Sequence, residues 1–347
     1  MIVDDSIVAR AVLSRMIGAH PDLEVVAQAG SGRAALALLG EITVDLILLD
    51  LEMPGMGGLE ALPDLIRLGG GARVLIVSSA CGEGACSSIS ALRLGAADTL
   101  LKPGIGGLGD DFEHILIDRL RRIAATPTAT PLRMAGEPPT VPPEIAPQGP
   151  IGCVAIGAST GGVHALAAFF AAYPQACDAP ILVTQHLPAP FMPYFVGQLH
   201  EMAGRPARLA ADGMAVTPGT ILLAPGDAHL SLASTRGLIH VRLERRRADS
   251  GCLPSVDPMM EAVARLYGPT AIGVILSGMG RDGLAGARIL AAAGGEILAQ
   301  DAPSSVVWGM PGSVVGAGLA RVALPPAGLA RRIARRHAQA KAAAPWN

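Results

Sequence analysis

A proline-rich stretch near the middle of the chain limits how the rest of it can fold. Eight prolines lie between Thr126 and Pro150, and the segment has almost no hydrophobic periodicity. Such a segment stays extended and cannot pack into a core, so we interpret it as a linker between two separately folded regions. The predicted division is a first domain over residues 1–124, a linker over 125–150, a second domain over 151–330 and a basic tail over 331–347.

The composition of the 347-residue chain excludes several classes of protein. Half of the residues are hydrophobic and only 16% are charged, which provides material for packed cores and rules out a wholly disordered chain. A net charge of −2 and only 3% aromatic residues argue against nucleic-acid binding, which needs a basic field and rings that stack on bases. The apolar runs are far shorter than the ~20 residues of a membrane span, so no membrane insertion is expected.

The cysteine pattern and the first residues indicate the compartment. The five cysteines form no CxxC pair; they are Cys81, Cys86, Cys153, Cys177 and Cys252. Neither a disulfide framework nor a structural zinc site is therefore expected. Asp4 and Asp5 stand where a secretory signal would carry positive charge. We therefore predict a cytoplasmic protein with reduced thiols.

Both regions alternate short apolar runs with helical stretches, which is typical of a doubly wound α/β fold with a parallel sheet. Strands are predicted in the first region at 2–3, 23–28, 44–49, 74–77 and 99–101. Those of the second are predicted at 151–156, 181–185, 220–223, 272–276 and 296–299, with an antiparallel hairpin of 230–233 and 238–243 around Gly237. In the tail, four arginines have near-helical spacing: Arg331, Arg332, Arg335 and Arg336. This spacing predicts a solvated helix rather than an anion-binding site.

Polar side chains follow four strands predicted in the first region. They are Asp4, Asp5, Asp50, Ser78 and Lys102. Because the carboxyl ends of parallel strands line one crevice, these side chains are expected to converge. Packed carboxylates need a cation, and oxygen-only ligation suits Mg²⁺. One carboxylate could then attack a phosphoryl group, whose oxygens the lysine and the hydroxyl would hold.

Four motifs carry these residues: VDDS at 3–6, LLDLEMPGMGGLE at 48–60, VSSA at 77–80 and LKPG at 101–104. On these motifs, residues 1–124 resemble a response-regulator receiver domain. The resemblance implies a flavodoxin-like fold in which Asp50 accepts the phosphoryl group. It also implies that Asp5, Asp50 and the Glu52 carbonyl bind Mg²⁺, with Asp4 in the same acidic pocket.

The same resemblance assigns Ser78 and Lys102 to sensing the phosphorylated state. Two features depart from the receiver pattern. The chain starts only two residues before VDDS, so the first strand is expected to be shorter than in most receivers. Thr99 stands where receivers often carry an aromatic switch residue, so that part of the relay is expected to differ.

The second region carries a glycine-rich turn, GASTGG at 157–162, between a predicted strand and a helix expected to begin near Val163. It matches the G-x-S-x-G pattern of a nucleophile elbow, in which small neighbours allow a tight turn and expose the Ser159 hydroxyl. Backbone N–H groups at the helix start offer an oxyanion site. A phosphate cradle is the alternative, although the turn lacks G-x-G-x-x-G spacing and a P-loop lysine.

Two further strand ends of this region carry His186 and Asp282. A serine hydroxyl needs a base to take its proton, imidazole can do so, and a buried carboxylate fixes the imidazole tautomer. We therefore predict a catalytic triad of Ser159, His186 and Asp282. Its chain order differs from that of α/β-hydrolases, so a different hydrolase scaffold is expected. Four other histidines are predicted to be structural or exposed: His164, His200, His229 and His240.

Six motifs follow one another in the second region: GASTGG (157–162), QHLP (185–188), APGDAHL (224–230), LPSVDPMMEAVA (253–264), SGMGRDG (277–283) and SSVVWGMPG (304–312). In this order, behind a receiver-like region, they resemble the chemotaxis protein-glutamate methylesterase (CheB) family. The resemblance implies a Rossmann-like catalytic domain with a β-hairpin and the same triad. It assigns the backbone N–H groups of Thr160 and Met279 as oxyanion donors.

The resemblance also implies a function and partners. Family members hydrolyse glutamate γ-methyl esters on methyl-accepting chemoreceptors, releasing methanol, and many deamidate receptor glutamines. No cofactor is expected for the esterase, and a chemotaxis histidine kinase is the expected phosphodonor at Asp50. A phospho-dependent adaptor with an idle or re-targeted esterase domain is one alternative, and a nucleotide-dependent enzyme is another.

Overall fold

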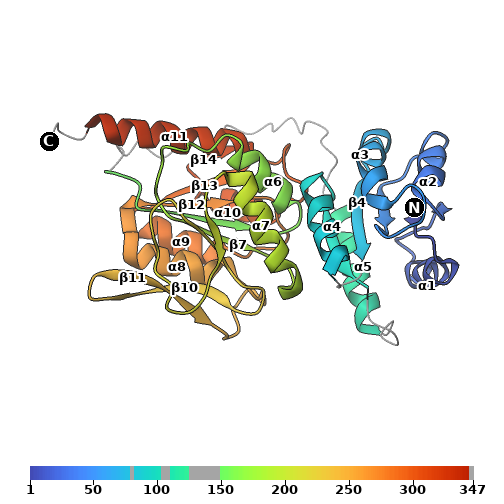
Figure 1. The fold of residues 1–347 in the computed structure, drawn as a ribbon, viewed down its shortest axis with the longest axis horizontal. Coiled ribbons are helices and arrows are strands. Elements are labelled where there is room, and N and C mark those ends of the chain that lie inside the picture. The colour runs from blue at the N-terminus through green and yellow to red at the C-terminus, as the bar shows by residue number, and fades with distance from the viewer. Residues whose placement is uncertain (79–81, 103–109, 125–148, 344–347) are drawn as a thin grey trace. The chain divides into compact units, whose positions relative to one another are not determined.

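The computed structural model describes residues 1–78, 82–102, 110–124 and 149–343. The chain divides into two compact units, Met1–Thr128 and Ala129–Asn347, each built around its own parallel sheet (Figure 1). Almost all of the predicted linker lies outside the described residues. The domain boundaries at 124, 150 and 330 therefore stay a prediction.

The first unit contains five parallel strands in the order β2-β1-β3-β4-β5. The strands are β1 Ile2–Val3, β2 Gln28–Ala29, β3 Leu46–Leu49, β4 Arg73–Ser78 and β5 Asp98–Leu101. The helices are α1 Ile7–Gly18, α2 Gly32–Leu39, α3 Gly58–Leu68, α4 Gly82–Arg93 and α5 Asp110–Ala124. The first two helices begin after Ser6 and Ser31, whose hydroxyls each accept an N–H of the first turn.

The strand predicted at 23–28 is wrong in extent. The observed strand β2 covers only Gln28 and Ala29, which pair with Ile2 and Val3 of β1. Because β2 lies at the edge of the sheet, β1 is its one partner in the sheet, and a two-residue partner supports only a two-residue ladder. The alternating residues from 23 to 27 are left partly or fully exposed.

The second unit contains seven parallel strands in the order β14-β13-β12-β6-β7-β9-β8. They are β6 Cys153–Ala158, β7 Ile181–Gln185, β8 Ala207–Leu209, β9 Ile221–Leu223, β12 Ala271–Ile275, β13 Glu296–Gln300 and β14 Val322–Leu324. The helices are α6 Gly162–Phe170, α7 Met192–Ala203, α8 Val256–Tyr267, α9 Leu284–Ala292, α10 Met310–Gly316 and α11 Pro326–Ala343, with short 3-10 turns at Ala189–Phe191 and Gly268–Thr270. The α/β class predicted for both units is confirmed.

Helices cover both faces of this larger sheet. Figure 1 shows α6 and α11 on one side and α8 and α9 on the other, with a hairpin beyond α8. The predicted hairpin is confirmed: β10 His229–Thr235 pairs antiparallel with β11 Leu238–Glu244. Its two connecting residues, Arg236 and Gly237, both have positive φ angles, as a tight two-residue hairpin turn requires.

The prediction of a solvated C-terminal helix is only half right. Helix α11 runs through the predicted boundary at 330, and Arg331 and Arg335 are exposed. Two other arginines point back toward the sheet, because Arg332 and Arg336 both form ion pairs with Glu296 at the start of β13. The helix is therefore held to the sheet by charge as well as by packing.

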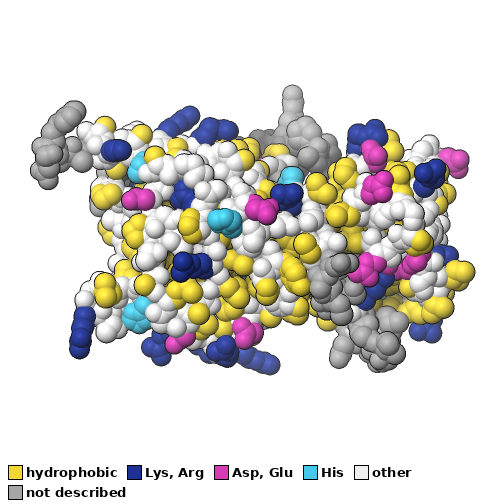
Figure 2. All heavy atoms as spheres, in the orientation of Figure 1, with side chains coloured by type: hydrophobic (Ala, Val, Ile, Leu, Met, Phe, Trp, Pro, Cys, Tyr) yellow, Lys and Arg dark blue, Asp and Glu magenta, His cyan; other side chains and the backbone are white. Residues whose placement is uncertain are grey.

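The surface of the described chain mixes both signs of charge. On the face drawn in Figure 2, Lys and Arg side chains are interspersed with Asp and Glu rather than gathered in one patch. Within the part of the chain that the structure describes, no helix is both long and apolar enough to cross a bilayer.

Candidate active site and receiver pocket

Strand register brings the predicted nucleophile and base together. Strands β6 and β7 are parallel neighbours, and their last residues, Ala158 and Gln185, are paired. The next residue on each strand is therefore Ser159 on one side and His186 on the other. The His186 N–H continues the ladder by donating to the Ala158 carbonyl at 3.0 Å.

The turn after β6 depends on small residues. Gly161 has φ = 75°, a left-handed conformation that favours glycine, and it caps the start of α6. A side chain at Gly162 would collide with Gln185. The Gln185 amide in turn donates to the Ser159 carbonyl at 2.8 Å, which fixes the backbone that carries the serine.

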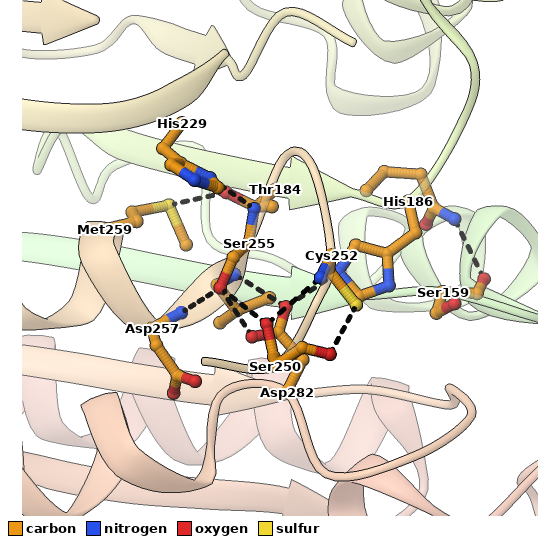
Figure 3. A network of polar contacts seen from close by, with 12 residues as sticks. Ser159, Thr184, His186, His229, Ser250, Cys252, Ser255, Asp257, Met259 and Asp282 are labelled. Atoms are coloured by element: carbon orange, nitrogen blue, oxygen red, sulfur yellow. Dashed lines mark hydrogen bonds and ion pairs between the residues drawn. The ribbon is translucent and has the colours of Figure 1, made fainter. Parts of the chain in front are cut away.

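The third predicted residue, Asp282, lies in the loop after β12 and contacts His186. Its Oδ2 lies 2.7 Å from His186 Nε2, and its side chain is only 1% exposed (Figure 3). Burial alone would raise the pKa of Asp282, but the hydrogen bond from His186 and other hydrogen bonds outweigh it and hold the pKa well below its usual range. Asp282 is therefore an ionised partner for the imidazole, and Nδ1 of His186 is the ring nitrogen left for Ser159.

The start of α8 orients the Asp282 carboxylate. The Ser255 hydroxyl donates to Oδ1 at 2.6 Å, and the Val256 N–H donates to Oδ2 at 2.7 Å. Ser255 is also the N-cap of α8, where its hydroxyl accepts the Asp257 N–H. The N-terminal end of a helix favours a nearby negative charge, so α8 stabilises the ionised form of Asp282.

A second buried histidine supports this helix start. His229 Nδ1 accepts the Ser255 N–H at 2.9 Å, and its Nε2 lies 2.7 Å from the Arg246 carbonyl. An acceptor at one nitrogen and a carbonyl at the other require a neutral ring with the proton on Nε2. The structural role expected for His229 is thus observed: it positions Ser255.

The predicted oxyanion donors flank the serine. Thr160 follows Ser159 directly, is almost fully buried, and its carbonyl accepts the Ser277 hydroxyl at 2.8 Å. A Cβ added at Gly278 would lie 2.9 Å from the Cβ of Ser159. The backbone leading into Met279 therefore lies against the nucleophile, although the donor roles of Thr160 and Met279 stay a prediction.

The receiver pocket centres on a lysine between two buried carboxylates. Lys102 Nζ lies 2.9 Å from Asp4 Oδ2 and 2.6 Å from Asp50 Oδ2. Burial raises the pKa of Asp50, and the hydrogen bond from Lys102 offsets only part of that effect. Burial alone would lower the pKa of Lys102, but its bonds to both carboxylates outweigh burial and raise it. The three groups are therefore strongly interdependent.

The oxygen atoms of this pocket suit a hard cation. Carboxylate oxygens of Asp4, Asp5 and Asp50 all lie within 4.8 Å of one another, and Asp5 is exposed. Oxygen ligands with access to water are what Mg²⁺ prefers. The Glu52 N–H donates to Asp50 Oδ1 at 3.2 Å, which places the segment carrying the Glu52 carbonyl beside the pocket.

One expected member of the pocket is engaged elsewhere. The Ser78 hydroxyl lies 2.5 Å from the Ser88 hydroxyl on α4, although the Ser78 carbonyl accepts the Lys102 N–H. Residues 79–80 of the VSSA motif and 103–104 of the LKPG motif lie outside the described residues. Thr99 is buried in β5, where its carbonyl accepts from Arg119.

Both units of the chain match known protein families. The family model described as CheB methylesterase matches residues 154–333, and the response regulator receiver domain model matches residues 1–106. The chain belongs to the CheB methylesterase family. The resemblances stated for its two regions are thereby confirmed.

Relatives of this CheB-family chain match it over most of its length. A protein-glutamate methylesterase/protein-glutamine glutaminase 2 of Caulobacter vibrioides is 41% identical over 329 residues, 94% of each chain. A protein-glutamate methylesterase/protein-glutamine glutaminase 1 of Paramagnetospirillum magneticum is 37% identical over 353 residues, 94% of this chain and 92% of that one. The crystal structure of the Thermotoga maritima CheB methylesterase catalytic domain matches with a TM-score of 0.52 and 34% identity, over 98% of that domain and 54% of this chain.

Sequence reasoning did not find the supporting residues of this CheB-family site. Ser255, His229 and Gln185 all lie in motifs that mark the family, but no strand-end argument singles them out. One available signal was the position of Ser255, directly before an amphipathic run, where a serine favours a helix N-cap. The carboxylate contact that makes Ser255 important is visible only in three dimensions.

Proposed function

We propose that this CheB-family chain is a protein-glutamate methylesterase that hydrolyses glutamate γ-methyl esters on chemoreceptors and deamidates receptor glutamines. The observation that carries the proposal is the 2.7 Å contact between His186 Nε2 and Asp282. It lies at the carboxyl ends of the paired strands β6 and β7, where Ser159 also lies. The matching relatives, whose names include both activities, support it.

The first half-reaction transfers the glutamyl group to the enzyme. His186 Nδ1 takes the Ser159 hydroxyl proton as Oγ attacks the ester carbonyl, and Asp282 stabilises the imidazolium. The carbonyl oxygen becomes an oxyanion held by the N–H groups of Thr160 and Met279. The proton on Nδ1 passes to the methoxy oxygen, the C–O bond breaks, and methanol leaves an acyl-serine.

The second half-reaction releases the product by the same chemistry. His186 takes a proton from water as the water oxygen attacks the acyl-serine carbonyl. The collapse of the tetrahedral intermediate returns that proton to Ser159 Oγ and leaves a glutamate side chain. With a glutamine substrate, ammonia replaces methanol as the leaving group, so one site supports both reactions.

The test of catalysis is methanol release from methylated chemoreceptor membranes. Ser159→Ala and His186→Gln should each reduce the rate by at least about 10³-fold, because the nucleophile and its base act as a unit. Ser234→Ala, on the exposed part of the hairpin, is the matched control and should retain the wild-type rate. Full release by Ser159→Ala would remove the serine-hydrolase proposal.

The receiver pocket adds phosphorylation control to the proposed function. Asp50 is the phospho-acceptor for a histidine kinase, and Asp5, Asp50 and the Glu52 carbonyl would hold Mg²⁺ with Asp4 nearby. When bound, Mg²⁺ would offset the negative charge shared by the carboxylates and the incoming phosphoryl group. Lys102 then pairs with a phosphoryl oxygen.

A hydroxyl would complete the binding of the phosphoryl group. Ser78 supplies it only after leaving its present contact with Ser88. Exchange of that one hydrogen bond would couple phosphorylation to the position of α4, a population shift driven by new charge.

Regulation is tested by adding a small-molecule phosphodonor and Mg²⁺ to the methanol assay. The phosphodonor should raise the rate of the wild type and have no effect on Asp50→Asn. Asp64→Asn on α3, a carboxylate in an exposed ion pair, is the matched control and should respond as the wild type does. Release that needs Ser159 but ignores the phosphodonor would overturn receiver control, whereas phosphorylation without any release would favour a signalling adaptor.

A further inference from the structure

A cysteine thiol lies beside the proposed catalytic pair and takes no part in the chemistry above. The Sγ of Cys252, a ring nitrogen of His186 and a carboxylate oxygen of Asp282 all lie within 4.8 Å of one another. Figure 3 shows the Cys252 sulfur next to the His186 imidazole. The thiol also donates a long hydrogen bond, 3.9 Å, to the Ser250 carbonyl.

The three donor atoms select a particular class of metal ion. Zinc binds thiolate sulfur, imidazole nitrogen and carboxylate oxygen, commonly with three protein ligands and a water molecule in a tetrahedral arrangement. Magnesium and calcium take oxygen ligands and have little affinity for a thiolate. The mixed set therefore differs in kind from the all-carboxylate pocket of the receiver.

The local geometry allows the ion to enter with little movement. Bonds of about 2.0–2.3 Å place tetrahedral zinc ligands roughly 3.3–3.7 Å apart, so the ligand atoms of His186 and Asp282, now 2.7 Å apart, need to separate by roughly 0.6–1.0 Å. Cys252 lies between β11 and α8, outside helices and strands, and is partly exposed. The His186 side chain is 17% exposed, so solvent reaches the same point.

We propose that His186, Cys252 and Asp282 form an inhibitory binding site for Zn²⁺. Binding displaces the Cys252 thiol proton to solvent and moves the proton between His186 and Asp282 to His186 Nδ1, which leaves Nε2 as the zinc ligand. Nδ1 then already carries a proton and cannot take the one on Ser159, and the ion occupies the carboxylate that would stabilise an imidazolium. Ser159 therefore loses its base while the metal is present.

Direct metal binding tests the site whether or not the esterase proposal holds. Equilibrium dialysis with Zn²⁺, in excess Mg²⁺ to occupy the receiver carboxylates, should show one zinc per chain. Cys252→Ser, which preserves size and polarity, should weaken binding by about tenfold or more, and His186→Gln should do the same. Cys86→Ser, at an exposed cysteine on α4, is the matched control and should bind as the wild type does.

Cobalt absorption and activity complete the test. Co²⁺ bound to the wild type should give a thiolate charge-transfer band that is absent from Cys252→Ser. In the methanol assay, Zn²⁺ should inhibit the wild type at about tenfold lower concentration than Cys252→Ser, each compared with its own metal-free rate. Equal zinc affinity in the wild type and Cys252→Ser, or cobalt binding without a thiolate band, would overturn the site.

Discussion

Ser255 donates its hydroxyl to Asp282 at 2.6 Å and thereby turns the other carboxylate oxygen toward His186, 2.7 Å away. Because Ser255 is also the N-cap of α8, the start of one helix sets the direction of the proposed catalytic carboxylate. His229 Nδ1 accepts the Ser255 N–H and so fixes the backbone of that residue. The orientation of the His186 imidazole therefore depends on three other side chains, those of His229, Ser255 and Asp282.

Removing the Ser255 hydroxyl should slow catalysis without weakening substrate binding. A hydrogen bond to a charged group contributes about 1.5–3 kcal/mol, so Ser255→Ala should lower kcat about 10-fold or more with little change in KM. Ser255→Thr keeps the hydroxyl and should restore part of the rate, whereas an unchanged kcat in Ser255→Ala would contradict the positioning role.

Replacing the carboxylate itself should have a larger effect. Asp282→Asn leaves the size of the side chain unchanged but removes the charge that fixes the tautomer of His186, so kcat should fall by about 10³–10⁴-fold. Adding Ser255→Ala to this variant should cost little more, because both residues act through one imidazole. The measurement is kcat for the two single variants and the double variant. Multiplicative losses would show that Ser255 acts independently of Asp282.

Much of the fold was predictable from hydrophobic patterning because the inner strands are buried on both faces. Strand β7 was predicted at its observed bounds, Ile181–Gln185, since all five residues are buried and the strand opens with three apolar residues. The two outermost strands, β8 and β14, were not predicted. Each is only three residues long and none of these residues is fully buried, so the hydrophobic signal is too short to identify a strand.

The sequence allowed a site residue to be predicted where that residue directly follows a strand, because the ends of parallel strands lie close together. Ser159 and His186 follow paired strands, and Asp4 and Asp50 converge on Lys102 in the same way. Contacts made by loops carry no such signal. Neither the engagement of Ser78 with Ser88 nor the approach of Cys252 to His186 could be derived from spacing, because both depend on how a loop or helix packs.

A carboxyl group at the start of α8 should make stability depend on pH. The pKa of Asp257 is raised from 3.8 to about 6. Burial is the largest cause, and the nearby charge of Asp282 adds to it. Its protonated form thus favours the folded state, and that stabilisation is complete below pH 3.8 and is lost as the pH rises through about 6. Asp257→Asn keeps an oxygen to accept the Gly286 N–H and removes the charge.

The Tm of Asp257→Asn relative to the wild type should therefore increase between pH 4 and pH 7. Thermal unfolding across this range measures the difference. Asp249→Asn, at an exposed carboxylate in the loop before α8, is the control and should show no such trend. A constant difference in Tm would mean that Asp257 is ionised in the folded protein throughout this range.

Loss of Lys102 should destabilise the first unit, and Mg²⁺ should restore part of the lost stability. Lys102→Met leaves Asp4 and Asp50, 2% and 5% exposed, without their cation. Removing one partner of a buried ion pair costs about 3–5 kcal/mol, and the partial exposure of Lys102 reduces the expected loss to about 1–3 kcal/mol. Denaturant unfolding with and without Mg²⁺ measures it. Added Mg²⁺ should stabilise Lys102→Met more than the wild type, because the ion replaces the missing positive charge.

The control for this experiment is an ion pair of the same unit that water can screen. Arg67→Met breaks the ion pair between Arg67 and Asp64, whose side chains are 67% and 51% exposed respectively. The loss should lower the free energy of unfolding by at most about 0.5 kcal/mol. It should also leave the response to Mg²⁺ unchanged. If Lys102→Met behaved like Arg67→Met in both respects, the lysine would not be what keeps the buried carboxylates ionised, and the cation proposed for this pocket would lose its main support.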